Sequence, residues 1–520
     1  MPAADATHLP PHPPHRPALA HAALLLALAF LLFGVRLGDS GLSASEGFRA
    51  IPAWEMLRSG DLVVTTLFDT PYVRKPPGIV WAIAASSAAL GETEAAARLV
   101  SALATTLGAL LLWWSCSRWF GRVPGLCAGA AYFLTPVLWM PARSAEIEAL
   151  HNLFVLPSGL LLLHRLAAPD PSPRPLGARL WMVGGLGVSV AAMALTKGPA
   201  GLPALAGILL GACLARRSLR PLHAWDLWGG LALGAGLVGL WALLLAARLR
   251  HLDLPPVLED ARFLWREGKT LGVLVLVPAA LAGALPWALA LPFALRRHDD
   301  TPGAFVGAGA AWGVIVGLAF YCVIGVDNTR YAMPALLFVP VAYAAALAAH
   351  AHARGTRRLW GWRLFLGAPA LPMLTLILAG VGYCQWFEHW RDVRHSGRAA
   401  GVALAAALPD HATIVADELL DTRPEVLWYA QRTIAARGGH LRVVWAPGLP
   451  PERVPAEAFV LLRTDNEPRM NRKPEMALLD GRNDLFDRDL RVEGAVHKFE
   501  FMLLGPARSG VPIPQGGENP

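Results

Sequence analysis

Long apolar runs follow one another along most of this chain, separated by short polar segments. Each run has the length and the lack of charge that are typical of a membrane-spanning helix. The runs lie near 18–36, 97–116, 123–141, 149–166, 180–196, 198–214, 225–247, 271–295, 303–325, 331–350 and 364–385. The pattern predicts a polytopic α-helical membrane domain over residues 18–385, with about 11–13 transmembrane helices.

Two places depart from simple spans. The motif Thr196-Lys197-Gly198-Pro199 separates two apolar runs and predicts two helices broken at this point. The segment 78–91 is apolar but short. If it crossed the membrane, the orientation of every later loop would invert, so we expect a juxtamembrane or re-entrant helix that begins and ends on the outer side.

Arginines gather in the loops on one side of this layout. The positive-inside rule assigns that side to the cytoplasm. The opposite, periplasmic side then receives the first outer loop 37–96, the 143–148 loop, Lys197, the 248–270 loop and the turn 327–330. The arginines on the cytoplasmic side are Arg118, Arg122, Arg165, Arg174, Arg179, Arg216, Arg217, Arg220, Arg296, Arg297, Arg354, Arg357, Arg358 and Arg363.

Composition agrees with a membrane protein. Of 520 residues, 55% are hydrophobic and 16% charged, whereas soluble domains carry roughly 25% charged residues. The net charge of +8 resides in loops and indicates no nucleic-acid partner. The Pro- and His-rich residues 1–17 predict a disordered cytoplasmic N-terminus, and the run that follows is interpreted as an uncleaved first span.

Residues 386–520 have a different character. Charge rises, and short apolar runs alternate with turns at 413–416, 441–445, 459–462 and 496–504, with a helical pattern at about 423–436. This pattern predicts a small extracytoplasmic α/β domain. Residues 508–520 are expected to form a loose tail.

The first outer loop holds the most informative polar residues. Glu46 precedes an expected amphipathic helix, Phe48–Ser59, so its carboxylate is either a catalytic base, a cap of that helix, or both. Further along, Tyr72, Arg74 and Lys75 precede a rigid Pro-Pro pair. Arginine and lysine bind phosphate well, although the same cations also occur as ordinary contacts to lipid headgroups.

Other polar residues fall at span ends on the same predicted side. Glu146 and Glu148 flank Ile147, Lys197 separates two apolar helices, and Arg330 and Tyr331 follow Asn328-Thr329. Ionisable groups in such places are costly and often functional. Glu146 and Glu148 are candidates to bind a divalent cation together with Glu46. The 248–270 loop is either a solvated loop or a lid over an anionic substrate.

These motifs together resemble the ArnT-like and protein O-mannosyltransferase-like polyprenyl-phosphate glycosyltransferases of the GT-C superfamily. The resemblance covers roughly residues 20–350. The matching pieces are Glu46, Trp54 to Asp61, Pro71-Tyr72, Lys75 to Gly78, Trp81, Ala97-Arg98-Leu99, Trp119-Phe120-Gly121, Ala142-Arg143, Glu148, Leu195 to Pro199, Arg330-Tyr331 and Pro334.

The resemblance implies an inverting transferase at the periplasmic face of a bacterial inner membrane. Its donor would be a polyprenyl-phosphate sugar, and its acceptor a lipid, a protein or an envelope glycan. Glu46 and Glu148 would be catalytic. By position, Tyr72 and Lys75 would meet the lipid phosphate. Arg74, Lys197, Arg330 and Tyr331 are the further candidates for binding the donor phosphate. A divalent cation at Glu46 and Glu148 is the one cofactor considered.

The sequence departs from the family at four positions. Ser45 stands where an aspartate is usual, Phe48 where an arginine is usual, Arg74 where a glutamate is frequent, and Glu148 where an aspartate is usual. These changes put a metal requirement in doubt and leave Glu46 or Glu148 as the base. The alternatives are a binding or transport protein for a lipid-linked sugar, a scaffold whose tail domain binds a partner, and a catalytically inactive relative.

Overall fold

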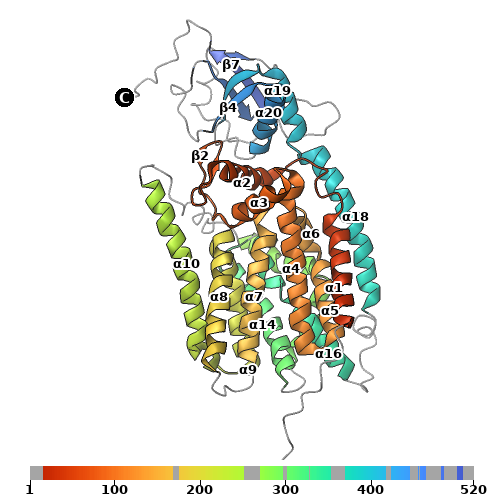
Figure 1. The fold of residues 1–520 in the computed structure, drawn as a ribbon. Helices are drawn as coiled ribbons and strands as arrows, with labels where there is room; N and C mark the ends of the chain where they lie inside the picture. The colour runs from red at the N-terminus through yellow and green to blue at the C-terminus, as the bar shows by residue number, and fades with distance from the viewer. Residues whose placement is uncertain are drawn as a thin grey trace, which may run out of the picture.

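The computed structural model is mostly helical and consists of a tall bundle with a small α/β domain stacked on one end (Figure 1). Of the segment 1–17 that was expected to be disordered, residues 1–15 lie outside the described residues, whereas residues 16 and 17 begin a helix. The tail 508–520 and nearly all of the 248–270 loop also lie outside the described residues. The structure describes residues 16–167, 175–250, 270–296, 301–326, 328–352, 369–416, 423–445, 455, 457–463, 482–484 and 501–507.

Every predicted span has a helical counterpart in the part of the chain that the structure describes. Seven helical stretches there are long and apolar enough to cross a membrane, or up to nine if each of two bent pairs is one span. The chain is therefore a multi-pass membrane protein. The bundle contains α1 (Arg16–Ala29), η1 (Phe30–Gly34), α4 (Glu94–Phe120), α5 (Arg122–Phe133), η3 (Pro136–Leu138), α6 (Trp139–Ala142), α7 (Ile147–Ala167), α8 (Leu176–Lys197), η4 (Gly198–Gly201), α9 (Leu202–Arg216), η5 (Arg220–His223), α10 (Trp225–Leu249), α12 (Thr270–Gly283), η7 (Trp287–Ala290), α13 (Leu291–Leu295), α14 (Pro302–Val323), α15 (Thr329–Leu336), α16 (Val339–His352) and α18 (Ala370–His395).

Proline and glycine decide where these helices break. The predicted spans 123–141 and 271–295 correspond to helix pairs that bend by 53° and 102°. Each bend lies beside a proline, Pro136 or Pro286, which cannot donate a backbone hydrogen bond. The predicted break after Lys197 is confirmed: Gly198 has φ +62°, a left-handed conformation that ends α8.

The first outer loop folds into a layer across the end of the bundle (Figure 1). It contains η2 (Ala44–Glu46), α2 (Gly47–Ser59), a two-stranded ribbon of β1 (Thr66–Leu67) and β2 (Thr70–Pro71), and α3 (Gly78–Leu90). With 13 residues, α3 is too short to span a membrane. The short helix expected at 78–91 is thus confirmed; that it is a juxtamembrane or re-entrant helix on the outer side stays a prediction. The helix expected over Phe48–Ser59 is confirmed as α2, but it lacks the exposed polar face of an amphipathic helix over residues 47–56, which are all buried.

The C-terminal domain covers this layer. Its five-stranded sheet has the order β4-β3-β5-β7-β6, with β3 parallel to β4 and β5, and β7 antiparallel to β5 and β6. The predicted α/β character is confirmed. The sequence pattern missed α19, and the described part of the expected run 496–504 lies in β7. The elements are α19 (Arg398–Ala407), β3 (His411–Ala416), α20 (Pro424–Ala436), β4 (His440–Trp445), β5 (Phe459–Arg463), β6 (Arg482–Asp484) and β7 (Phe501–Ala507).

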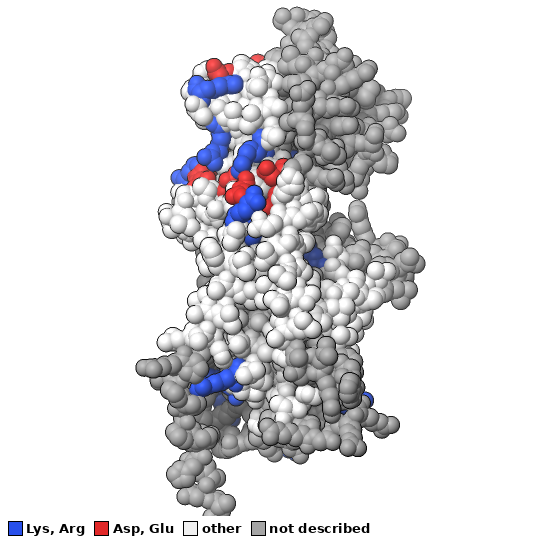
Figure 2. Space-filling view, turned by 90° about the vertical axis from the view of Figure 1, so that its right-hand side faces the viewer, with Lys and Arg blue, Asp and Glu red and all other residues white. Residues whose placement is uncertain are grey.

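Charge on the surface is arranged in bands along the long axis (Figure 2). On the face shown, acidic and basic side chains gather where the C-terminal domain meets the bundle, a broad belt almost free of charge follows, and cations return near the other end. An uncharged belt of this kind is typical of a surface in contact with lipid. The layer formed by α2 and α3 therefore lies at one edge of the apolar belt.

Candidate active site

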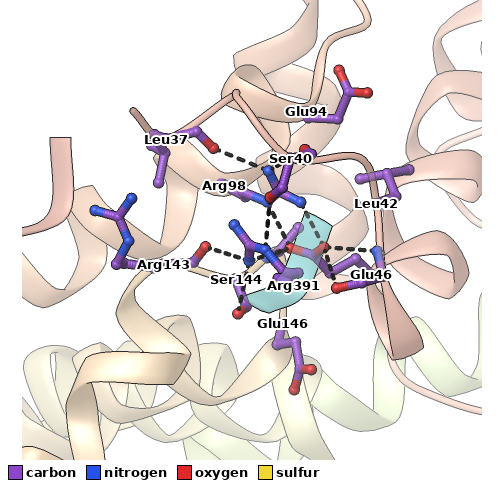
Figure 3. A network of polar contacts seen from close by, with 12 residues as sticks. Leu37, Ser40, Leu42, Glu46, Glu94, Arg98, Arg143, Ser144, Glu146 and Arg391 are labelled. Atoms are coloured by element: carbon purple, nitrogen blue, oxygen red, sulfur yellow. Dashed lines mark hydrogen bonds and ion pairs between the residues drawn. The ribbon is translucent and has the colours of Figure 1, made fainter. Parts of the chain in front are cut away.

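A buried ion pair anchors the start of the first outer loop. Arg98, in the second turn of α4, donates from Nε and Nη2 to the two carboxylate oxygens of Glu46, each at 2.8 Å (Figure 3). The Arg98 side chain is 0% exposed and that of Glu46 is 1% exposed. Arg98 also donates to the backbone carbonyls of Leu37, Ser40 and Gly41. One guanidinium therefore holds both the loop backbone and the Glu46 carboxylate.

Helix α18 extends this network from the other end of the sequence. Arg391 donates to Ser40 Oγ at 2.8 Å and to both oxygens of Glu388 at 2.7 Å. Arg143 donates to Glu388 Oε1 at 2.8 Å. The first loop, the turn before α7 and the helix that leads into the C-terminal domain thus share one set of buried charges.

Glu46, one of the two residues expected to be catalytic, has a closed and fully paired environment. Besides Arg98, its oxygens accept the backbone N–H groups of Ala145 at 2.8 Å and Ser43 at 3.0 Å. Burial by itself would raise the pKa of Glu46, but the charges of Arg98 and Arg391 and these hydrogen bonds lower it to about 2. A buried carboxylate that resists protonation so strongly is suited to holding structure, not to accepting a proton.

A second cluster of charges lies where α7, α8 and α15 begin or end. Glu148 accepts from Lys197 Nζ at 2.9 Å and from Arg330 Nη2 at 2.9 Å. Arg330 also pairs with Glu146. Lys197 Nζ lies 4.6 Å from the ring centroid of Tyr331, a cation–π contact. The structure thus brings together four of the residues predicted for the site, Glu148, Lys197, Arg330 and Tyr331.

Arg330 is the most exposed residue of this cluster. Its side chain is 38% exposed, whereas those of Glu146, Glu148 and Lys197 are 5%, 4% and 10% exposed. Glu146 Oε1 accepts from Ser45 Oγ at 3.0 Å, so the cluster also touches the first loop. An anion that approaches this cluster meets Arg330 first.

The segment Tyr72–Lys75 is held beside the same layer. Tyr72 stacks on Phe48 with ring centroids 5.6 Å apart, and the guanidinium carbon of Arg74 lies 6.0 Å from the Tyr72 ring centroid. Three residues after Lys75, Gly78 meets the end of α8: a Cβ there would lie 2.7 Å from Thr196 Oγ1. This close approach puts the Pro-Pro-Gly start of α3 next to the turn that carries Lys197.

Sequence reasoning did not assign a role to Glu55 or Arg98. Glu55 binds the β1–β2 turn, accepting from Thr66 Oγ1 at 2.6 Å and from Phe68 N at 2.7 Å. Burial raises the pKa of the Glu55 carboxyl. Arg98 could have been identified from its position, because a lone arginine near the start of an apolar run usually has a structural or functional role.

The carboxylates do not fit the divalent cation considered from the sequence. Within the described residues, no three His, Cys, Asp or Glu side chains gather as a metal-binding group. The Glu46 oxygens already accept from Arg98, Ala145 and Ser43. Binding a cation at Glu46 would require breaking a buried ion pair, so no step is assigned to a metal here.

The C-terminal domain is docked on α2 by aromatic and polar contacts. Trp54 of α2 stacks on Trp428 of α20 with ring centroids 4.4 Å apart. Tyr429 Oη accepts from Leu42 N at 2.8 Å and donates to Glu94 Oε1 at 2.6 Å. A Cβ on Gly47 would lie 3.0 Å from a Glu425 carboxylate oxygen, so the N-termini of α2 and α20 nearly touch.

Trp428→Ala is expected to loosen this docking. Removing a buried tryptophan costs about 3–5 kcal/mol in stability, and α2 would lose its aromatic partner. Thermal unfolding in detergent and limited proteolysis between the bundle and the C-terminal domain measure the effect. Trp181→Ala, at a side chain 68% exposed on α8, is the control and should leave both readouts unchanged; equal behaviour of the two variants would contradict this docking.

Comparisons with known proteins agree with this arrangement. A family model described as dolichyl-phosphate-mannose-protein mannosyltransferase matches residues 74–242. The undecaprenyl phosphate-alpha-4-amino-4-deoxy-L-arabinose arabinosyl transferase of Pectobacterium carotovorum is 25% identical over 338 residues, which are 61% of this chain and 57% of that protein. A second transferase of that name, from Pseudomonas fluorescens, is 30% identical over 62% of this chain and 55% of its own length. The chain thus spans little more than half the length of these relatives.

The match to solved structures is longer. ArnT from Cupriavidus metallidurans in the apo state superposes with a TM-score of 0.66 at 18% identity, over 94% of this chain and 98% of that one. The same protein bound to undecaprenyl phosphate gives 0.66 at 19% identity, over 95% and 99%. The chain therefore has the GT-C fold of the ArnT-like glycosyltransferases, and the resemblance predicted from its motifs is confirmed.

Proposed function

We propose that this protein is an inverting glycosyltransferase that takes a sugar from a polyprenyl-phosphate donor and passes it to a hydroxyl group of a lipid, a protein or an envelope glycan. The observation that carries the proposal is the cluster of Glu146, Glu148, Lys197 and Arg330, drawn from three helices and the turn before them and open at Arg330. Such a cluster offers a base and phosphate-binding cations at one point.

The cations take the donor phosphate. Arg330 is the exposed member and presents a guanidinium, which can form two hydrogen bonds to phosphate oxygens. Lys197 binds Glu148 beside it. Lys75 precedes Gly78, which packs against Thr196 next to Lys197, and we propose Lys75 as a third cation for the phosphate. When the bond between the anomeric carbon and the phosphate oxygen breaks, the electron pair stays on the phosphate, and these cations stabilise the negative charge.

Glu148 is the proposed base. Its carboxylate lies within reach of both cations, so a donor held there has its anomeric carbon near Glu148. The acceptor hydroxyl loses its proton to Glu148 as its oxygen bonds to the anomeric carbon from the face opposite the phosphate, which inverts the configuration. Arg74, at a position where related chains often carry glutamate, adds positive charge beside Tyr72.

Orientation follows from the charge bands. Among the described residues, Arg118, Arg165 and Arg216 lie near the ends of α4, α7 and α9 that point away from α2 and α3 (Figure 1). The positive-inside rule favours the cytoplasm for that end of the bundle. We propose that the site and the C-terminal domain face the periplasm of a bacterial inner membrane. Curated relatives from bacteria, named for an undecaprenyl phosphate-linked sugar, support this setting.

Binding of undecaprenyl phosphate tests the donor part of the proposal. Arg330→Gln and Lys197→Gln each remove one phosphate-binding cation, and each is expected to weaken binding by about tenfold to a hundredfold, because a charge-assisted hydrogen bond contributes about 1.5–3 kcal/mol. Titration of the detergent-solubilised protein with the lipid measures the affinity. Arg118→Gln, at the far end of α4, is the control cation and should bind as the wild type does. Unchanged affinity in both site variants would contradict the assignment.

A further inference from the structure

A second layer of polar side chains lies one helical turn beneath the charged cluster. His151 and Asn152 follow Glu148 on α7 by three and four residues, so all three lie on one face of the helix. The side chains of His151 and Asn152 are 1% and 2% exposed. Polar groups inside a membrane-spanning helix are costly and commonly functional.

The His151 side chain contacts the end of α8. Its Nδ1 lies 3.2 Å from the carbonyl oxygen of Met193, one turn before Lys197. A carbonyl oxygen only accepts, so Nδ1 carries the ring proton and Nε2 is left as an acceptor. Among the described residues, Nε2 has no hydrogen-bond partner, and it faces Gly201, where a Cβ would lie 3.1 Å from it. The ring is thus wedged between the last turn of α8 and the end of η4.

Asn152 makes the matching contact to α15. Its Nδ2 donates to Met333 Sδ at 3.1 Å. Met333 follows Arg330 by three residues on the same short helix. His151 therefore contacts α8 one turn before Lys197, and Asn152 contacts α15 about one turn after Arg330.

We propose that His151 and Asn152 are positioning residues that fix Lys197 and Arg330 at the spacing needed for the donor phosphate; this inference rests on the proposed function. Three observations carry it: both contacts start from the face of α7 that bears Glu148, both end about one turn from a cation, and His151 leaves a buried ring nitrogen unpaired. An unpaired buried polar atom lowers stability, so stability alone does not account for a histidine here. An apolar residue of similar size would fill the same space at less cost.

The test compares variants that keep the volume but change the hydrogen bond. His151→Leu and Asn152→Leu remove the contacts, whereas His151→Gln keeps an N–H donor for the Met193 carbonyl. Thr105→Val on α4 is the matched control, because Thr105 is buried and its hydroxyl binds only the Ser101 carbonyl of its own helix. The readouts are the melting temperature, the affinity for undecaprenyl phosphate, and kcat and KM for sugar transfer.

We expect His151→Leu and Asn152→Leu to lower kcat by about a hundredfold, since misplacement by about 1 Å has effects of that size. Affinity for undecaprenyl phosphate should weaken by about tenfold, while the melting temperature stays within the range of Thr105→Val. His151→Gln should recover most of the loss. If His151→Leu fails to fold, Asn152→Leu and His151→Gln decide by the same criteria.

The inference is overturned if the leucine variants match Thr105→Val in kcat and affinity while Lys197→Gln is impaired; the proposed function would then stand alone. It is also overturned if His151→Gln is as impaired as His151→Leu, because retention of the donor would then be irrelevant. If the wild type transfers no sugar, the proposed function fails, and the affinities for undecaprenyl phosphate then decide the positioning role. A wild type that neither binds this lipid nor transfers sugar overturns both.

Discussion

Glu148→Gln is expected to lower kcat for sugar transfer by about 10²–10⁴-fold, the usual contribution of a general base. Glutamine keeps the size and the hydrogen-bonding capacity of the side chain but does not accept a proton at neutral pH. Because the change also removes a negative charge from between Lys197 and Arg330, affinity for the donor phosphate should stay the same or increase. Steady-state kinetics beside lipid titration separate the two effects.

The pattern should be opposite for the cations. Lys197→Gln is expected to weaken donor binding, whereas Glu148→Gln is expected to lower turnover without weakening donor binding. Glu92→Gln is the control carboxylate, since Glu92 forms a surface ion pair with Arg58 and should be silent in both assays. A Glu148→Gln variant that retains more than half of the wild-type kcat would show that Glu148 is not the base.

Glu46→Gln is expected to destabilise the protein by about 3–5 kcal/mol, the usual effect of removing one partner of a buried ion pair. The Arg98 guanidinium would keep its three backbone carbonyls but lose its buried counter-charge. We expect a lower melting temperature and proteolysis within the first outer loop. Activity should fall in proportion to the folded fraction.

Acid should weaken this ion pair in the wild type. The pKa of Glu46 lies near 2 in the folded protein, below its ordinary value of 4.5. The stabilisation is therefore fully present above the ordinary pKa and is lost as the pH falls from there through about 2. Unfolding midpoints measured from pH 7 to pH 3 should fall less in Glu46→Gln than in the wild type. A Glu46→Gln variant that is as stable as the wild type yet inactive would restore Glu46 to the catalytic role first expected from its sequence position.

Most of the fold could be predicted because its signals are local. Apolar runs indicate spans, arginine-rich loops indicate one side, and the short segment 78–91 is too short for a crossing. Each of these depends on residues close together in the sequence. Pro136 and Pro286 mark in the sequence where the two bends lie. The angle of each bend could not be predicted, because it depends on how neighbouring helices pack, which no local pattern specifies.

The candidate site was predictable in part. Lys197, Arg330 and Glu148 are conspicuous because each is an ionisable residue at the end of an apolar run. The environment of Glu46 was not predictable, because its main partner, Arg98, is 52 residues away and Arg391 is 345 residues away. The burial of α2 could not be predicted for the same reason, because Trp54 packs against Trp428, which is far away in the sequence.

The central claim is that the protein transfers a sugar from a lipid-phosphate donor at the cluster of Glu148, Lys197 and Arg330. The most direct test is transfer of radiolabelled sugar from polyprenyl-phosphate donors to a membrane extract by purified wild type, Glu148→Gln, Lys197→Gln and Arg118→Gln. The account predicts transfer by wild type and Arg118→Gln, and its loss in the other two. Transfer that survives in both site variants, or a wild type that binds undecaprenyl phosphate but turns over no donor, would contradict it.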